Sequence, residues 1–300
     1  MNYRHQFHAG NFADVMKHVL LGQLVRALQK KAKGFLVLDT HAGRGRYDLE
    51  AAATVRRAHG GPGDSLARKP EWPDGIGRLA AREDLPAAVA NYVALVREFD
   101  RRAGNIDGAL RFYPGSPWLA SAQARPQERL VFCEKHPAEC AALRAEFLFQ
   151  SSPGAEVREM DGYTAVRAML PPPERRALVL IDPPFEAQDE FAQIAAALGE
   201  GLRRLPGGVF AVWYPLTERA RVEEFFSAVR ALSPPPTLAA ELMIASERAA
   251  MKMKGCGLLV INPPWQFDAE AAAVLAFLGE ALAQAPGGGG RVDWVVRERA

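Results

Sequence analysis

The stretch FLVLDTHAGRG, residues 35–45, contains the two features that decide the fold. An apolar run at 35–38 predicts a strand buried on both faces, and the pattern Asp39-x-x-x-Gly43-x-Gly45 follows it directly. Glycines here permit a tight turn and let a ligand approach the backbone closely. The spacing differs from the dinucleotide pattern G-x-G-x-x-G, and an acid ahead of the glycines suits a cationic ligand. Any strand-to-helix turn can show such glycines by chance, so the rest of the chain must support this interpretation.

On both sides of this stretch, apolar runs of strand length alternate with Ala-rich helical stretches. A first helix is expected at 12–31, with Asn11 as its N-cap, because apolar side chains recur there at helical spacing. Further strands are expected at 130–133, 157–160, 177–181, 209–213, 257–261 and 292–296, and further helices at 137–149, 188–203, 219–232 and 269–284. This alternation predicts an α/β fold with a doubly wound, mostly parallel sheet.

The interval between the first two sheet strands is too long for an ordinary crossover. The first strand ends near Asp39 and the next begins near Leu130, whereas the whole crossover normally needs only about a dozen residues. An insertion is therefore expected, with a Gly/Pro/Arg-rich stretch followed by a helical segment at 86–101. We expect residues 1–45 and 110–300 to form the main domain and residues 46–109 to form a small inserted helical subdomain.

Composition and charge are typical of a protein of the cytoplasm. The chain has 300 residues, 49% of them hydrophobic, and a formal net charge of +2, so total charge neither requires nor excludes a nucleic-acid partner. Residues 1–34 hold six basic residues against one acid; they could contact phosphates, although a solvated helix face is the commoner cause. Three irregularly spaced cysteines fit no zinc pattern, and neither a signal peptide nor an apolar run of about 18 residues is present. We expect no membrane and no obligate protein partner.

Two more acidic positions follow predicted strands. Glu134 comes directly after the second sheet strand, where an acid can accept hydrogen bonds from both hydroxyls of a ribose; an ordinary surface glutamate is the alternative. Asp161-Gly162 follows the next strand and would lie beside an adenine ring. The carboxyl ends of parallel strands meet at one edge of a sheet, so we expect these acids to line the same site as the glycine turn.

The stretch LVLIDPPF, residues 178–185, carries the chemistry. Two consecutive prolines remove two backbone donors and fix two φ angles, which predicts a stiff, extended segment after a buried strand. In such a segment Asp182 and the Pro183 carbonyl could each accept one N–H of an exocyclic amine, while Phe185 stacks on the base that bears it. An Asp-Pro turn that merely closes a strand is the structural alternative. The strand in front of it and the glycine turn upstream favour the functional interpretation.

Asn262-Pro263-Pro264-Trp265 repeats this pattern late in the chain. It also follows an apolar strand, but we expect that strand to be a late one near an edge of the sheet. Asp182 is therefore favoured over Asn262 as the reactive centre.

Longer motifs that are typical of one protein family occur from one end of the chain to the other. They are YRHQFHAGNFADVMKH at 3–18, LDTHAGRGRY at 38–47, YPGSP at 113–117, EKHP at 134–137, DG at 161–162, LIDPPF at 180–185, WYP at 213–215 and INPPW at 261–265. With these motifs the chain resembles the bacterial 23S rRNA adenine-N6 methyltransferases of the ribosomal large subunit methyltransferase J family. The resemblance implies a class I methyltransferase fold, Rossmann-like, with a small inserted helical subdomain.

The resemblance also implies roles for particular residues. It places Asp182, with Pro183 and Phe185 of the same motif, in the catalytic centre, and Tyr3 in contact with the substrate RNA. We add Arg4 and Lys17 to the RNA contacts because they lie in the same basic segment. Phe185 replaces the family's usual Tyr, which keeps the stacking surface and loses a hydroxyl. Contacts with the cofactor S-adenosylmethionine are implied for His18, His41, Gly43, Ser116, Glu134, Asp161, Gly162 and Asp182.

Without the resemblance, His18 would be interpreted as a core histidine, whereas His41 lies within the glycine turn and cannot avoid the ligand pocket. A metal site built from His5 and His8 is the weaker alternative, since no carboxylate or cysteine stands at ligand spacing. We expect no metal.

The expected activity is N6-methylation of an adenine in 23S ribosomal RNA, which by resemblance is adenine 2030 in the reference numbering. The base must leave its stack to reach such a pocket. Methylation of DNA adenine or of a protein glutamine amide uses the same motif, and a non-catalytic RNA-binding protein that kept the fold is the alternative from another class. The basic N-terminus favours a nucleic acid, and the intact Asp182, Gly43 and Gly45 argue against a retired site.

Overall fold

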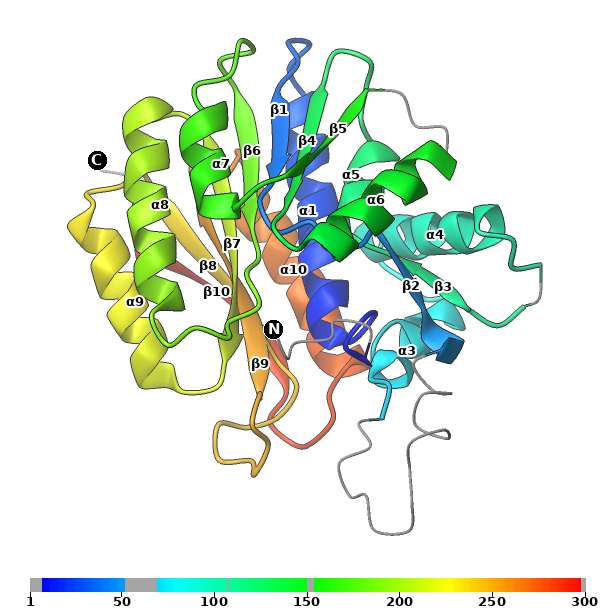
Figure 1. Cartoon of the computed structure of the whole chain (residues 1–300). Coiled ribbons are helices and arrows are strands. Elements are labelled where there is room, and N and C mark those ends of the chain that lie inside the picture. Colours follow the sequence, from blue (N-terminus) through cyan, green and yellow to red (C-terminus); the bar gives the residue numbers. More distant parts are fainter. Residues whose placement is uncertain (1–6, 52–68, 107, 150–153, 298–300) are drawn as a thin grey trace.

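The computed structural model describes residues 7–51, 69–106, 108–149 and 154–297, and a single large sheet runs through the middle of the molecule (Figure 1). Its eight strands lie in the order β10-β8-β9-β7-β6-β1-β4-β5. In chain order they are β1 (Leu36–Asp39), β4 (Arg129–Glu134), β5 (Ala155–Glu159), β6 (Ala177–Ile181), β7 (Val209–Leu216), β8 (Thr237–Met243), β9 (Gly255–Ile261) and β10 (Gly289–Val296).

Most of the sheet is parallel. Strands β5, β4, β1, β6 and β7 pair in parallel, and β9 runs antiparallel to both of its neighbours, β7 and β8. Strand β10 pairs antiparallel with β8 at the edge. The carboxyl ends of six strands therefore meet at one edge of the sheet, which is the lower edge in Figure 1.

Helices cover both faces of the sheet, as a doubly wound fold requires. They are α1 (Phe12–Gln29), α3 (Ile76–Ala80), α4 (Ala87–Arg102), α5 (Ser116–Ser121), α6 (Pro137–Phe149), α7 (Gly162–Met169), α8 (Glu190–Arg204), α9 (Arg219–Ala231) and α10 (Phe267–Ala281), with a 3-10 helix η2 at Trp72–Asp74. One buried cluster joins α1, α4, α5, α6 and α10 to the sheet, and a second joins α7, α8 and α9 to the other face. In β1, Val37 enters the first cluster while Leu36 and Leu38 enter the second, so a strand buried on both faces appears as a continuous apolar run.

The predicted elements are confirmed, with shifts of a few residues at their ends. Asn11 caps α1, because its side chain accepts hydrogen bonds from the backbone N–H groups of Ala13 and Asp14. Strand β8 and the short helices α5 and α7 were not predicted. The sequence of β8 is TLAAELM, in which Glu241 interrupts the apolar run. The structure buries this carboxylate and pairs it with Arg219, Arg291 and the Tyr214 hydroxyl, which no local pattern could show.

The long interval between β1 and β4 contains the helices expected of it. Strands β2 (Arg46–Asp48) and β3 (Phe112–Pro114) pair antiparallel at its two ends and bring them together. Between them, α4 buries Val89, Tyr92 and Val96 in the same cluster as α1. The described part of this segment therefore packs on the core of the main domain, and the domain boundaries at 45 and 110 stay a prediction.

The expectation for the second Pro-Pro motif needs correction. Strand β9, which precedes Asn262, lies in the interior of the sheet between β7 and β8 rather than near an edge. It also runs against them: Ile261 pairs with Phe210 and Gly255 with Leu216. Asn262 therefore lies at the amino ends of the parallel strands, opposite the edge where Asp182 follows β6. Its side-chain amide donates to the backbone oxygens of Pro206 and Gly208, which is a structural role.

Two further findings concern the described residues as a whole. None of their helices is long and apolar enough to cross a membrane. The three cysteines, Cys133, Cys140 and Cys256, are buried and form no disulfide.

Candidate functional site

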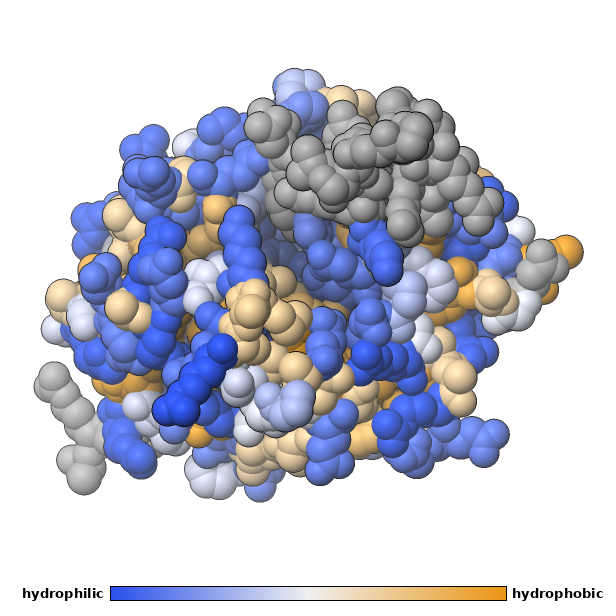
Figure 2. Space-filling view, turned by 90° about the horizontal axis from the view of Figure 1, so that it is seen from below, coloured by the Kyte–Doolittle hydropathy of each residue, from blue (hydrophilic) through white to orange (hydrophobic). Residues whose placement is uncertain are grey.

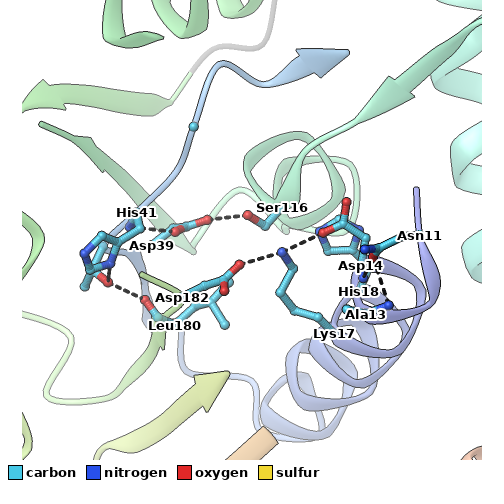
Figure 3. A network of polar contacts seen from close by, with 12 residues as sticks. Asn11, Ala13, Asp14, Lys17, His18, Asp39, His41, Ser116, Leu180 and Asp182 are labelled. Carbon is cyan, nitrogen blue, oxygen red and sulfur yellow. Dashed lines mark hydrogen bonds and ion pairs between the residues drawn. The ribbon is translucent and has the colours of Figure 1, made fainter. Parts of the chain in front are cut away.

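The acids that follow the parallel strands meet at the carboxyl edge, as predicted. Asp39 ends β1, Glu134 ends β4, and Asp182 follows β6 directly. Asp161 stands two residues beyond β5 and is the N-cap of α7. Figure 3 shows Asp39 and Asp182 facing the first turns of α1, which completes the site from the other side.

Helix α1 contributes a buried ammonium group to this site. The Nζ of Lys17 lies 2.5 Å from Oδ2 of Asp182 and 2.9 Å from Oδ1 of Asp14. The other oxygen of Asp14 accepts a hydrogen bond from the backbone N–H of Gly10, 3.0 Å away, so the helix start fixes the carboxylate that holds Lys17. Burial alone would lower the pKa of Lys17, but the two carboxylates raise it well above its ordinary value. The ammonium therefore stays charged between two acids.

The segment after Asp182 is irregular, with neither helix nor strand from 182 to 186. Asp182 keeps part of its side chain exposed, 18%, so one carboxylate serves both Lys17 and the open side of the site. Phe185 adopts φ +50° and turns its ring toward two others. Its ring meets Phe191 edge-on with centroids 5.1 Å apart and Trp213 edge-on at 5.7 Å. These contacts hold the aromatic ring in a fixed relation to the carboxylate.

Asp39 lies behind this segment with its carboxylate almost fully buried. It accepts a hydrogen bond of 2.6 Å from the Ser116 hydroxyl and one of 3.2 Å from the backbone N–H of His41. Burial raises the pKa of Asp39 to about 6, with a further contribution from the negative charge of Asp182; the Ser116 hydrogen bond opposes this rise. The site therefore contains a carboxyl group that titrates near neutrality.

His41 is held in one tautomer by its neighbours in the glycine turn. The Thr40 hydroxyl donates to the Leu180 carbonyl at 2.9 Å, and the same oxygen lies 2.8 Å from Nδ1 of His41. Since the hydroxyl hydrogen is already used, Nδ1 carries the hydrogen that it donates to Thr40, and Nε2 is left as an acceptor. Burial lowers the pKa of His41 to about 4, so the ring is neutral at physiological pH.

The glycine turn and Glu134 hold each other in place. The backbone N–H of Gly43 donates to one oxygen of Glu134 at 2.9 Å, and the N–H of His136 donates to the other at 2.7 Å. Gly43 adopts φ +65°, and a Cβ there would lie 2.6 Å from the Tyr47 hydroxyl. A residue with a side chain would therefore be strained and would also displace Tyr47.

The start of α7 packs directly against the backbone at the start of the glycine turn. Asp161 accepts from the N–H of Thr164 at 3.0 Å, and Lys135 lies 3.1 Å from its other oxygen. Although partial burial opposes it, these hydrogen bonds lower the pKa of Asp161. A Cβ on Gly162 would lie 2.2 Å from the Thr40 carbonyl oxygen, so only glycine fits between the two turns.

Two predicted site residues lie elsewhere than expected. Lys17, predicted as an RNA contact, is only 5% exposed and is held in a cluster with Asp14 and Asp182. His18 turns away from that cluster and packs under α4, where its Nδ1 lies 2.8 Å from the Tyr113 hydroxyl. Tyr113 in turn lies 2.8 Å from the Tyr92 hydroxyl. Gly43, Ser116, Glu134, Asp161, Gly162 and His41 gather around Asp39 and Asp182 as expected.

Some predictions fall outside the described residues or find no support there. Tyr3, Arg4 and His5 lie outside the described ranges. His8 pairs with Glu71 at 3.0 Å. Among the residues that the structure describes, no group of three or more His, Cys, Asp or Glu side chains is arranged to hold a metal ion.

Other contributors were missed by sequence analysis. Thr40 sets the His41 tautomer, and the Tyr163 ring meets His41 edge-on with centroids 5.2 Å apart. Trp213 packs against Phe185. Thr40 and Trp213 lie within the quoted motifs THAGRG and WYP, so their positions were marked, but their partners come from other strands and could not be inferred.

Comparisons with known proteins agree with this geometry. The family model described as "Ribosomal RNA large subunit methyltransferase D, RlmJ" matches residues 32–296. The Ribosomal RNA large subunit methyltransferase J of Escherichia coli (strain K12) is 37% identical over 99% of this chain and 100% of its own length. The protein of the same name from Haemophilus influenzae is 36% identical over 99% of this chain and 100% of its own length.

A solved structure shares the whole fold. Protein LPL1258 from Legionella pneumophila superimposes with a TM-score of 0.80 at 33% identity, covering 96% of this chain and 98% of its own. The fold is that of a class I methyltransferase with a mostly parallel sheet. The extent of the family match, together with relatives aligned over their full length, shows that this chain belongs to the RlmJ family of ribosomal RNA large subunit methyltransferases.

Proposed function

We propose that this enzyme transfers a methyl group from S-adenosylmethionine to N6 of a specific adenine in 23S ribosomal RNA, acting in the cytoplasm. One observation carries the proposal: Asp182, at the carboxyl edge of the sheet, keeps 18% of its side chain exposed while Lys17 holds one of its oxygens. Membership of the family and the names of its two relatives favour ribosomal RNA as the substrate.

The residues of the carboxyl edge suit the cofactor. A Cβ at Gly43 or Gly162 would collide with Tyr47 or Thr40, so these glycines let the turns that follow β1 and β5 pack closely at this edge. Glu134 uses one lone pair on each oxygen for a backbone N–H, which leaves further acceptor sites for ribose hydroxyls. Asp39 and Asp182 suit a cationic group, and Nε2 of His41 adds a neutral acceptor. When bound, S-adenosylmethionine supplies an electrophilic methyl group.

The chain's own groups would orient the amine. Asp182 and the Pro183 carbonyl accept its two N–H groups, which directs the nitrogen lone pair out of conjugation with the base. Phe185, braced by Phe191 and Trp213, presents a ring on which the base stacks. Lys17 neutralises part of the Asp182 charge and holds one of its oxygens. Alignment and well-placed acceptors supply the rate enhancement, as positive charge develops on nitrogen.

The inserted segment and the target nucleotide complete the proposal. We treat residues 46–109 as a helical subdomain inserted into a catalytic domain formed by 1–45 and 110–300. By resemblance the target is adenine 2030 in the reference 23S rRNA numbering. Tyr3 and Arg4 are proposed to contact the RNA, and the cofactor contact of His18 rests on the resemblance alone, since its ring packs against Tyr92 and Tyr113.

A transfer assay tests this function directly. Purified protein is incubated with labelled S-adenosylmethionine and with unmodified 23S rRNA, double-stranded DNA or protein substrates in parallel. We expect label in the rRNA as N6-methyladenosine at a single site. Transfer to DNA or protein alone would reject the substrate, and no transfer to any acceptor would favour the non-catalytic RNA-binding alternative.

A further inference from the structure

The loop between β8 and β9, residues 244–254, lies at the same edge of the sheet as Asp182. Gly255 pairs with Leu216 of β7 on one side and with Met243 of β8 on the other, so the loop projects from the carboxyl ends of these strands. Its base is closed by two backbone hydrogen bonds: Ile244 N–H to the Lys254 carbonyl at 2.9 Å, and Lys254 N–H to the Leu216 carbonyl at 3.1 Å. In Figure 1 it hangs below β9, on the side of the catalytic edge.

The base of the loop is joined to the catalytic motif by packed side chains. The thiol of Cys256, the second residue of β9, lies beside the Trp213 side chain. The Trp213 ring meets the Phe185 ring edge-on at 5.7 Å. The loop therefore ends two residues before Cys256, which is two side-chain contacts from Phe185.

The sequence of the loop turns its charges outward. Met251 and Met253 pack against the core cluster that contains α1, while Lys252 between them is exposed. Arg248 is exposed as well, and Lys254 is half-buried.

Several other cations at this edge have acidic partners. Lys17, Lys135 and Arg219 form ion pairs with Asp182, Asp161 and Glu241, respectively. The single acid of the loop, Glu247, lies 3.9 Å from Arg219. Within the described ranges, no Asp or Glu forms an ion pair with the three basic side chains of the loop.

We propose that Arg248, Lys252 and Lys254 form a phosphate-binding rim that holds the RNA backbone beside the flipped target base. This inference rests on the proposed function, since it concerns the RNA substrate of the same site. Cations that no acid neutralises release counterions when they meet phosphates, which gives binding energy without reading sequence. Figure 2 looks onto this edge and shows a recess near the middle of the face, with hydrophilic side chains beside it.

Exposed basic residues far from the catalytic edge provide a matched control. Lys31 and Lys33 are also exposed, but they follow the last turn of α1 at the opposite edge of the sheet. Arg167 lies in the second half of α7, which runs toward that edge too. A triple variant at these three positions therefore removes the same charge as a triple variant of the rim while leaving the catalytic edge untouched.

The experiment measures RNA binding and turnover in three proteins. They are the full-length wild type, R248A/K252A/K254A and K31A/K33A/R167A, each titrated with unmodified 23S rRNA from about 50 to 300 mM salt. For the rim variant we expect roughly tenfold or greater weakening of RNA binding and a slope of log K against log salt reduced by about 2 to 3, because each lost phosphate contact removes about 0.7 to 0.9 from the slope. Its KM for RNA rises accordingly, while kcat at saturating RNA and the affinity for S-adenosylmethionine stay at wild-type values.

The control variant should keep the wild-type slope. The rim is overturned if R248A/K252A/K254A retains the wild-type affinity and slope, or if both triple variants lose the same amount, since the effect would then be one of net charge. Either result leaves the proposed function standing as long as the wild type methylates rRNA. The proposed function is rejected separately if the wild type transfers no methyl group to rRNA. The rim proposal would still hold in that case if the wild type binds rRNA and the rim variant lowers the slope of log K against log salt.

Discussion

The Nζ of Lys17 lies 2.5 Å from Oδ2 of Asp182, although 165 residues separate them in the sequence. The first helix thus reaches across the carboxyl edge and holds the carboxylate that follows β6. Because Asp14 binds the same ammonium from one turn away, the start of α1 and the Pro-Pro segment form one polar unit. Anything that displaces α1 must therefore change the orientation of Asp182.

Removal of the ammonium should destabilise the fold. Lys17→Met leaves Asp14, which is 3% exposed, without its charged partner, and breaking a buried pair in this way costs about 3 kcal/mol. Urea denaturation measures the loss. The double variant D14N/K17M should recover part of it because the buried Asp14 charge is then gone and only Asp182, which is 18% exposed, has lost its cation. An unchanged free energy of unfolding in Lys17→Met would show that the pair contributes nothing to stability.

Asp39 should give the protein a specific dependence on pH. Its pKa is about 6 in the folded protein, above the ordinary value of a carboxyl group, so the folded state binds more protons than the unfolded state between about pH 4 and 6. Stability conferred by this group therefore falls as the pH rises through that window and then levels off. Asp39→Asn removes the titration, so from pH 4 to pH 8 its stability should gain on wild type by on the order of 1–3 kcal/mol.

The measurement is a series of urea denaturation curves for both proteins at pH 4 to 8. Only the difference between them is used, since other groups titrate equally in both. A difference that stays constant across the range would mean that Asp39 has the same pKa in the folded and unfolded states.

His41 should be neutral and protonated at Nδ1. Because burial lowers its pKa to about 4, the ring stays uncharged from about pH 5 upward, and the Thr40 hydroxyl selects the tautomer. Nitrogen-15 NMR of the His41 ring at pH 7 should show Nδ1 protonated and Nε2 bare. Thr40→Val removes the acceptor for Nδ1–H and should populate the other tautomer; a spectrum of Nε2–H in the wild type would contradict the assignment.

Gly162 should tolerate no side chain. A Cβ there would meet the Thr40 carbonyl oxygen at 2.2 Å, so Gly162→Ala must push α7 away from the glycine turn, at a cost of about 1–3 kcal/mol. We also expect weaker binding of S-adenosylmethionine, measured by calorimetry. Gly207→Ala is the matched control because nothing lies within 4 Å of a Cβ at that position. If the two variants have the same stability and the same affinity for S-adenosylmethionine, close packing at Gly162 is not what excludes a side chain.

Much of the fold follows from the sequence because the parallel strands are buried on both faces. Such strands appear as uninterrupted apolar runs, and those of β1, β4, β6 and β7 needed no tertiary information. Strand β8 was missed for the opposite reason: Glu241 within it is stabilised by Tyr214, Arg219 and Arg291, which come from β7, α9 and β10. The reversed direction of β9 was also invisible, since an apolar run has no direction.

The sequence predicted which residues lie at the site, but it did not predict which of them contact one another. Strand ends mark an edge, so Asp39, Glu134, Asp161 and Asp182 could be grouped from the sequence alone. The partner of Asp182 could not be found in this way, because Lys17 lies on a helix whose packing angle decides what its side chain reaches. A basic residue near the N-terminus suggested an exposed contact, whereas the fold buries it between Asp14 and Asp182.

The central claim is that Asp182, and not Asn262, is the reactive centre. It is tested by comparing methyl transfer to unmodified 23S rRNA in Asp182→Ala and Asn262→Ala, with the fold of each checked by circular dichroism. Loss of an acceptor aimed at the reacting nitrogen should lower kcat at least about 100-fold in Asp182→Ala. The Asn262 side chain donates to the Pro206 and Gly208 carbonyls at the opposite edge of the sheet, so its variant should keep wild-type turnover. Full activity in Asp182→Ala, or loss of activity in a folded Asn262→Ala, would contradict the account.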